Sequence, residues 1–223
     1  SSRNLKKGLK IKDMAVIVFV EKIHKASMRI LGETGMRFHH ADAIKVLKEH
    51  GIHVEGDIAY FTEEDIMYWV KQAPREALLY AADSRYDMKI GGDNQYVGPC
   101  GGATFIMDRD GHTRDAVFSD FIKLIKLFEG NPDYCLNGGL ACQPKDIPVE
   151  YSVVLLALAS LTHTEKCIFA AAGDYQMMET LIRMTCIKFG VTPEQLKEKP
   201  RLCTIANTNT PLLLDKNMTE TIF

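Results

Sequence analysis

DYCLNGGLACQPKDIPVEYSVVLLALASLTHTEKCIFAAAGD, residues 133–174, is the stretch of sequence that decides the fold class. It opens with a short apolar run that ends in two glycines, and an apolar segment of helical length follows at residues 149–163. A second short apolar run then occupies residues 167–172. Short strands that are apolar throughout, alternating with helices, are typical of parallel sheets covered by helices. The stretch therefore predicts a strand–helix–strand unit of an α/β protein.

The same alternation continues on both sides of this stretch. Upstream, residues 96–101 read as a strand, residues 103–117 as a hairpin and residues 120–130 as a helix. Downstream, a helix, a strand and the beginning of another helix follow at residues 174–190, 201–207 and 215–223. We expect parallel, adjacent strands near residues 96–100, 134–142, 167–172 and 202–207, in that order, with the connecting helices on one face. The spacing alone does not separate an open sheet from a barrel.

Residues 1–94 have a different pattern, in which helices alternate with hairpins. Helical spacing covers residues 14–33, 41–50 and 63–73, and two short strands flank a Gly56-Asp57 turn. We therefore expect an α+β extension over residues 1–94 and a catalytic domain over residues 95–223. The run MAVIVFV, residues 14–20, is too short to span a membrane and is predicted to be a buried helix segment.

Composition excludes several classes of protein. The chain has 46% hydrophobic and 25% charged residues with a formal net charge of -2, which predicts a globular protein without general affinity for nucleic acid or anionic membranes. Its six cysteines form no CxxC pair, as expected of reduced thiols in a cytoplasmic protein. No HxxxH, HExxH or GxSxG pattern occurs, so the sequence predicts neither a metal site nor a serine hydrolase triad.

The glycines of GPCGG, residues 98–102, lie where α/β proteins build their sites, at the carboxyl end of a strand. A hairpin follows them instead of a helix, so they do not form a phosphate-binding loop. Two alternatives remain open. Gly101 and Gly102 allow a ligand to approach the backbone, or they serve the chain's own geometry through a positive φ.

Four segments together resemble the trimethylamine methyltransferase (MttB) superfamily. They are IHKASMRILGETGMRFHHADAIKVLKEHGIHVEG, TEEDIMYWVKQAP, GGDNQYVGPCGGATFIMD and CQPKDIP, and they cover nearly the whole chain in order. The resemblance implies a (β/α)8 TIM barrel behind an N-terminal extension, and methyl transfer from a methylated amine to the cobalt of a corrinoid carried by a partner protein. Because about four βα units are present where a barrel has eight, we expect the N-terminal half of a barrel.

The resemblance implies that the substrate is trimethylamine or a quaternary amine such as glycine betaine. The chemistry of these substrates suggests which residues at the strand ends bind them. A carboxylate on the substrate would need amide donors, for which Gln143, Asn207 and Asn209 are candidates, and Asp146 could face the cation. Asp146 could equally cap a helix, and the amides could do the same. The catalytic residues are not evident, and the chain is not expected to bind a cofactor directly.

A non-catalytic half-barrel that self-associates or acts as a binding module is the alternative function. Unpaired edges of an incomplete barrel favour self-association, so we expect a homo-oligomer. The length of the reading frame separates the two hypotheses, because about as many residues again after Phe223 would favour the enzyme fragment.

Overall fold

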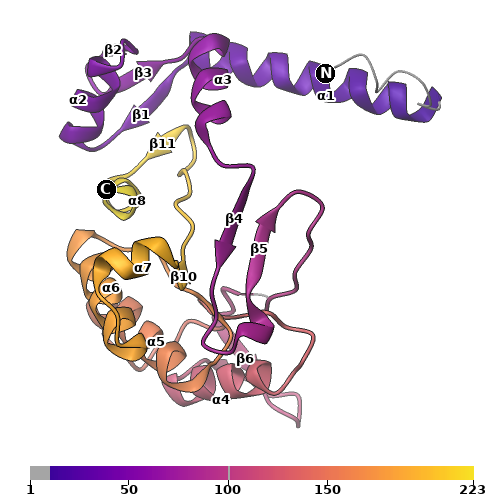
Figure 1. The fold of residues 1–223 in the computed structure, drawn as a ribbon, viewed down its shortest axis with the longest axis vertical. Helices are drawn as coiled ribbons and strands as arrows, with labels where there is room; N and C mark the ends of the chain where they lie inside the picture. The colour runs from indigo at the N-terminus through magenta and orange to yellow at the C-terminus, as the bar shows by residue number, and fades with distance from the viewer. Residues whose placement is uncertain (1–10, 100) are drawn as a thin grey trace. The chain divides into compact units, whose positions relative to one another are not determined.

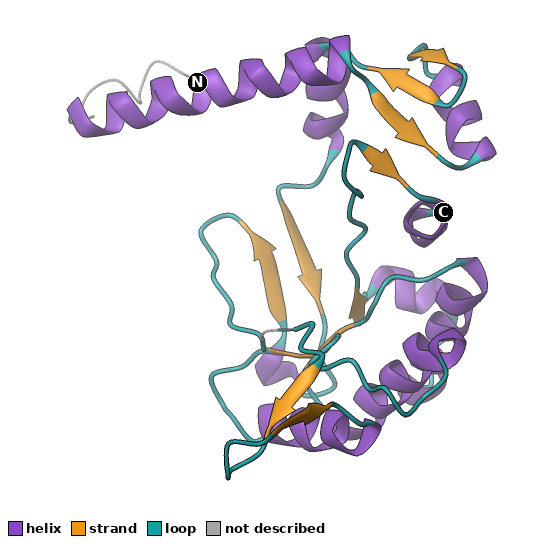
Figure 2. Cartoon of the chain, turned by 180° about the vertical axis from the view of Figure 1, so that it is seen from behind, coloured by secondary structure: helices purple, strands orange, loops and turns teal. Residues whose placement is uncertain are grey.

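The computed structural model describes residues 11–99 and 101–223 of a mixed α/β chain (Figures 1 and 2). Cys100, expected at the end of the first parallel strand, lies outside these residues. The chain forms two compact units, of which the first reaches Ala73 and also includes Thr208–Lys216. The second contains Pro74–Asn207 and Asn217–Phe223. The sequence predicts that the catalytic domain begins at residue 95. That functional boundary stays a prediction, because the two units are defined by contacts alone.

The first unit contains a four-stranded sheet in the order β11-β1-β3-β2. Strand β1 pairs antiparallel with β3, β3 pairs antiparallel with β2, and β11 joins β1 in parallel with Arg37 opposite Leu213. The strands are β1 (Met36–Phe38), β2 (His53–Glu55), β3 (Ile58–Tyr60) and β11 (Leu213–Leu214). The predicted hairpin at Gly56 is thus confirmed, with a positive φ of 61° at this glycine.

Three helices accompany this sheet: α1 (Ile11–Glu33), α2 (Ala41–Glu49) and α3 (Glu63–Gln72). The C-terminal end of α1 contacts the sheet, where the Phe61 amide donates to the Leu31 carbonyl at 3.1 Å. Farther towards the N-terminus, Val18, Phe19 and Val20 are 51%, 65% and 57% exposed. The predicted burial of this run is therefore wrong for these three residues, since the contact with the sheet lies at the other end of α1.

The second unit contains a parallel sheet in the order β10-β9-β8. A parallel bridge between Val97 and Tyr134 places the segment before GPCGG beside β8. The expected order of parallel strands is therefore confirmed for the last three, and the first is represented by this bridge. The sheet strands are β8 (Leu136–Gly138), β9 (Cys167–Phe169) and β10 (Leu202–Cys203). Closure of such a sheet into a barrel stays a prediction.

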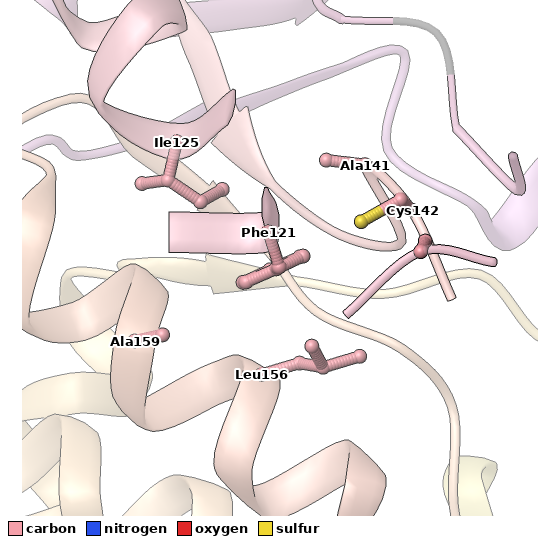
Figure 3. Close-up of a cluster of buried hydrophobic side chains, with 7 residues drawn as sticks. Phe121, Ile125, Ala141, Cys142, Leu156 and Ala159 are labelled. Atoms are coloured by element: carbon pink, nitrogen blue, oxygen red, sulfur yellow. The ribbon is translucent and has the colours of Figure 1, made fainter. Parts of the chain in front are cut away.

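Of the five helices that the structure describes in this unit, four lie in segments that the sequence predicts as helical, and α7 (Pro193–Glu198) was not predicted. Helix α4 packs on α5, and α5 packs on α6. Buried side chains of α4 and α5, among them Phe121, Ile125 and Leu156, form one core with Ala141 and Cys142 (Figure 3). The helices are α4 (Phe118–Glu129), α5 (Val149–His163), α6 (Tyr175–Phe189), α7 (Pro193–Glu198) and α8 (Lys216–Ile222). None of the helices in the described ranges is long and apolar enough to cross a membrane.

Two antiparallel hairpins complete the second unit. One consists of β4 (Glu76–Leu79) and β5 (Met88–Gly91), with a 3-10 turn at Ser84–Tyr86 between them. The other consists of β6 (Phe105–Met107) and β7 (Thr113–Asp115), and confirms the hairpin expected after GPCGG.

Candidate functional site

The β4–β5 hairpin covers the end of the parallel sheet at which the strands begin. Leu79 and Met88 of the hairpin pack with Cys167, the first residue of β9. The Tyr80 amide donates to the Pro200 carbonyl at 2.7 Å, and Arg201 donates to the Ala81 carbonyl at 2.8 Å, just before β10. The carboxyl ends of the strands therefore remain as the end where a site is expected.

A small cavity lies at these carboxyl ends. Its volume is about 80 Å³, which gives room for two or three water molecules at about 30 Å³ each. The lining comes from the GPCGG segment, from β8 with the residues after it, and from β9: Pro99, Gly101, Leu136, Asn137, Gly138, Gly139, Leu140 and Phe169. None of these described side chains is an acid or a base, so the described part of the wall suits the positioning of a ligand rather than proton transfer.

Gly138 and Gly139 are required by the approach of β9 to β8. A Cβ atom on Gly138 would lie 2.7 Å from the Phe169 carbonyl oxygen, and one on Gly139 would lie 2.6 Å from the Phe169 ring. Both glycines also have positive φ values, 97° and 69°. Any other residue would push the two strands apart at the wall of the cavity.

Asn137 fixes this wall from the interior. Its side chain is fully buried, its Oδ1 accepts from the Gly138 amide at 2.8 Å, and its Nδ2 donates to the Ile125 carbonyl of α4 at 3.0 Å. Nδ2 also lies 3.2 Å from both Glu129 Oε2 and Thr164 Oγ1. Because its polar atoms are satisfied from within the protein, Asn137 positions the glycines and is not free to act on a ligand.

The GPCGG segment is joined to the loop after β8 by backbone hydrogen bonds. The Gly102 amide donates to the Leu140 carbonyl at 2.5 Å, and the Gln143 amide donates to the Ala103 carbonyl at 2.7 Å. Gly101 lines the cavity, whereas Gly102 does not; Gly102 has a φ of 87°, and a Cβ added to it would meet nothing within 4 Å. Gly102 thus fits the alternative of chain geometry, whereas Gly101 both lines the cavity and packs against the chain's own backbone, with an added Cβ 3.1 Å from the Leu140 carbonyl oxygen.

The other predicted site residues occupy different places. Gln143 and Asn207 have exposed side chains in the second unit. Asp146 Oδ1 accepts from the Phe118 amide at 2.7 Å and so caps α4. It does not cap α5, the helix that directly follows it in the sequence. Asn209 belongs to the first unit, where its backbone exchanges hydrogen bonds with Leu213. The substrate-binding roles of these residues and of the two GPCGG glycines stay predictions.

Arg114 fastens the β6–β7 hairpin to the start of α4. It donates to Asp120 Oδ2 at 2.6 Å and to Asp108 Oδ2 at 2.9 Å. Asp120 is 5% exposed and also accepts from the Val117 amide at 3.2 Å, which completes the capping of α4. The Arg114 side chain lowers the pKa of Asp120 from 3.8 to about 2, because its hydrogen bonds favour the charged carboxylate.

This ion pair predicts a loss of stability in acid. A carboxyl group whose pKa is lower in the folded state stabilises the fold above its unfolded pKa, and this contribution disappears as the pH falls towards the folded value. We expect Asp120→Asn to lower the free energy of unfolding by about 1–2 kcal/mol at pH 7. The difference from the unmodified chain should shrink between pH 4 and pH 2, the range that the two pKa values define.

Urea unfolding at several pH values measures this difference. Asp133→Asn is the matched control, because the Asp133 side chain is exposed and makes no ion pair with a described residue. A constant difference from pH 7 to pH 3 for Asp120→Asn would contradict the assigned role of the carboxylate.

Buried cysteines near the sheet remain neutral thiols. Burial raises the pKa of Cys142 to about 11 and that of Cys167 to about 12. Both side chains are fully buried. Within residues 11–99 and 101–223, no group of three or more histidine, cysteine or acidic side chains is arranged to hold a metal ion.

Comparison with known proteins connects this arrangement to a family. Residues 3–223 match the family described as trimethylamine methyltransferase (MTTB). The chain belongs to the trimethylamine methyltransferase family. It is 34% identical over 199 residues to the glycine betaine methyltransferase of Desulfitobacterium hafniense (strain Y51), covering 89% of this chain and 41% of that protein. The chain therefore spans about two fifths of this relative's length.

Two further family relatives come from Eubacterium limosum. The proline betaine:corrinoid methyltransferase is 32% identical over 114 residues, and the L-carnitine:corrinoid methyltransferase is 23% identical over 110 residues. Each of these matches covers 49% of this chain and 22% of the relative. The three names share methyl transfer and differ in the substrate, so family membership confirms the resemblance and leaves the substrate open.

Sequence reasoning missed two residues that shape the cavity of this family member. Asn137 lies in a run that the sequence predicts as an apolar strand, although an amide directly before two glycines in such a run is a signal of a buried hydrogen-bonding role. Phe169 gave no signal, because its position over Gly139 depends on the pairing of β8 with β9.

Proposed function

We propose that the protein containing this chain transfers a methyl group from a methylated amine to the cobalt of a corrinoid held by a partner protein. The observation that carries the proposal is the 34% identity to a glycine betaine methyltransferase over 89% of the chain. A quaternary amine is the favoured substrate class, because each of the three relatives is named for one: glycine betaine, proline betaine or L-carnitine.

The proposed chemistry needs no acid or base on the protein. A quaternary nitrogen has no lone pair to protonate, so the methyl group is taken by direct displacement. The carbon–nitrogen bond breaks, the carbon–cobalt bond forms, and the electron pair of the broken bond leaves with the neutral amine. The cobalt(I) nucleophile supplies the electrons of the new bond. The protein has to hold the cation in line and exclude water.

The carboxyl ends of the parallel strands support this proposal in one respect. The cavity there is lined by backbone, apolar side chains and an internally satisfied amide, which suits positioning better than proton transfer. At about 80 Å³ it accommodates only a small group such as a methylated nitrogen. We infer that Gly101 belongs to the substrate-binding wall, and that Gln143, Asn207 and Asp146 contribute from the surrounding loops. Closure of the barrel belongs to the same proposal, whereas self-association through unpaired edges belongs to the alternative of an incomplete barrel.

A methyl-transfer assay with the complete protein tests the proposal. Trimethylamine, glycine betaine, carnitine and proline betaine are each incubated with a cobalt(I) corrinoid protein, and methyl-cobalt formation is followed by its absorbance. We expect at least one quaternary amine to methylate the cobalt. We expect the 223-residue chain alone to be inactive, because a barrel mouth needs the strands of both halves. Absence of transfer from all four amines would contradict the proposal.

Two glycine-to-alanine variants in the same assay test whether the substrate binds at the cavity. A Cβ atom on Gly101 would lie 3.1 Å from the Leu140 carbonyl oxygen at the cavity wall. We expect Gly101→Ala to reduce methyl transfer by about tenfold or more, the scale of a small misplacement in a positioned reaction. Gly111→Ala, in the β6–β7 turn, is the matched control and should retain activity. Equal activity of both variants would remove Gly101 from the site.

A further inference from the structure

A groove of about 520 Å³ lies on the first unit, where the end of α2 faces α3. His50, the residue that ends α2, lines it together with Glu64, Asp65, Tyr68 and Trp69 of α3. This size falls within the range of sites for small molecules, roughly 300–1,000 Å³. The groove is formed entirely by the first unit and has no residue in common with the cavity at the parallel strands.

The sequence of α3 pairs each carboxylate with an aromatic ring. In EEDIMYW, Glu64 precedes Tyr68 by four residues, and Asp65 precedes Trp69 by four. Residues four apart lie on the same face of a helix, one turn from each other. The helix therefore carries two negative charges directly beside two aromatic side chains.

The rings lie at steep angles to one another. The Trp69 ring centroid is 5.1 Å from that of Tyr68 with an interplanar angle of 83°, and 5.1 Å from that of His50 with an angle of 72°. His50 is held in place by a 2.9 Å contact between Nδ1 and the Val46 carbonyl. In edge-to-face contact the edge of one ring covers part of the face of the other, and the faces that remain free point in different directions, so a cation beside the pair can contact more than one of them.

The rings are accessible and the charge of the groove is uncompensated. Tyr68 is 56% exposed and Trp69 is 46% exposed, although large aromatic side chains are usually more covered. Asp65 is engaged as the cap of α3, where Oδ2 accepts from the Thr62 amide at 2.9 Å. Among the described residues, Glu64 has no ion-pair partner and no lysine or arginine lines the groove.

We propose that this groove binds an organic cation of the methylated-ammonium type. Aromatic faces attract such a cation through the ring quadrupole, and Glu64 supplies a carboxylate that has no ion-pair partner among the described residues. A strongly hydrated metal ion would gain little from the rings, and an anion would be repelled by both carboxylates. The proposal rests on the chemistry of the groove and is independent of methyl transfer.

Trp69 makes the proposal directly measurable, because it is the only tryptophan among the 223 residues of the chain. Choline is titrated at constant ionic strength while tryptophan fluorescence is recorded, and 3,3-dimethylbutanol, which has the same shape without the charge, is titrated in parallel. We expect saturable quenching by choline with a dissociation constant on the order of millimolar, given contacts of about 1 kcal/mol each. We expect no saturation with the neutral alcohol.

Three variants locate the binding. Tyr68→Leu and Glu64→Gln should each weaken choline binding by about threefold, as expected for exposed cation–π and charge contacts. Glu21→Gln is the matched control, an exposed acidic residue on α1 outside the groove, and should leave binding unchanged. Circular dichroism checks that each variant is folded, and Glu64→Gln carries the test if Tyr68→Leu is not.

Equal responses to choline and the neutral alcohol, or unchanged binding in both groove variants, would overturn the proposal. So would saturation by methylguanidinium in the absence of any response to choline, because it would assign the groove to arginine side chains of a protein partner. These outcomes would leave the methyl-transfer proposal intact, since that reaction is measured by methyl-cobalt formation.

Discussion

Gly138→Ala is expected to lower the free energy of unfolding by about 3 kcal/mol, through backbone strain and overpacking together. The added Cβ would lie 2.7 Å from the Phe169 carbonyl oxygen and 3.0 Å from Ser160 Oγ. The Phe169 oxygen cannot move away cheaply, because it accepts the Gly139 amide at 2.5 Å. The φ of 97° adds strain that alanine cannot relieve. Urea unfolding followed by circular dichroism measures the effect.

Gly111→Ala separates packing from backbone strain in this experiment. Gly111 also has a positive φ, 85°, but an added Cβ would meet nothing within 4 Å. We expect a loss of about 1 kcal/mol there, the cost of the backbone conformation alone. If the two variants lost the same stability, the close approach of β9 to β8 would not be what requires glycine at position 138.

Asn137→Leu is expected to cost about 3 kcal/mol, although leucine has a similar volume and is more apolar. The replacement removes the acceptor of the Gly138 amide and the donor to the Ile125 carbonyl, inside a fully buried site. A buried donor left without a partner costs the full free energy of its desolvation. The midpoint of urea unfolding should fall, and the slope of the transition should stay the same.

Asn94→Leu is the matched substitution on the surface. The Asn94 side chain is exposed and donates one hydrogen bond to the Gly91 carbonyl at 2.8 Å. Water replaces that partner, so we expect a change within about 0.5 kcal/mol. A tolerated leucine at position 137 would show that water or a shift of α4 satisfies the Gly138 amide.

The alternation of short apolar strands with helices was readable from the sequence because it depends on local pattern. The runs around Leu136, Ile168 and Leu202 are short and mainly apolar, and each is followed by helical spacing, so strand order and direction followed from connection rules. The capping box at Thr62 and Asp65 is local in the same sense, since its residues lie three positions apart. Local patterns of this kind can be recognised from the sequence because all their residues lie close together in the chain.

Contacts between distant residues were not readable in the same way. The capping of α4 by Asp146 joins residues 28 positions apart, and nothing in the sequence of α4 names its partner. The exposed Phe19 was predicted to be buried because apolar character alone does not show which surface covers a side chain. At the cavity, the glycines were noticed from their crowding, whereas the reason for each required the position of Phe169.

The parallel pairing of β1 with β11 has a consequence for the order of events during synthesis. Arg37 leaves the ribosome early, whereas its partner Leu213 follows only after the whole parallel-stranded segment has been made. During that interval β1 has one neighbour, β3, and an open edge of unpaired backbone groups. Completion of the first sheet is therefore a late, long-range step, slow because a large loop must close before the contact is gained. Pairing with β11 covers this edge of β1 and leaves an edge strand of only two residues, which is too short to favour pairing between two copies.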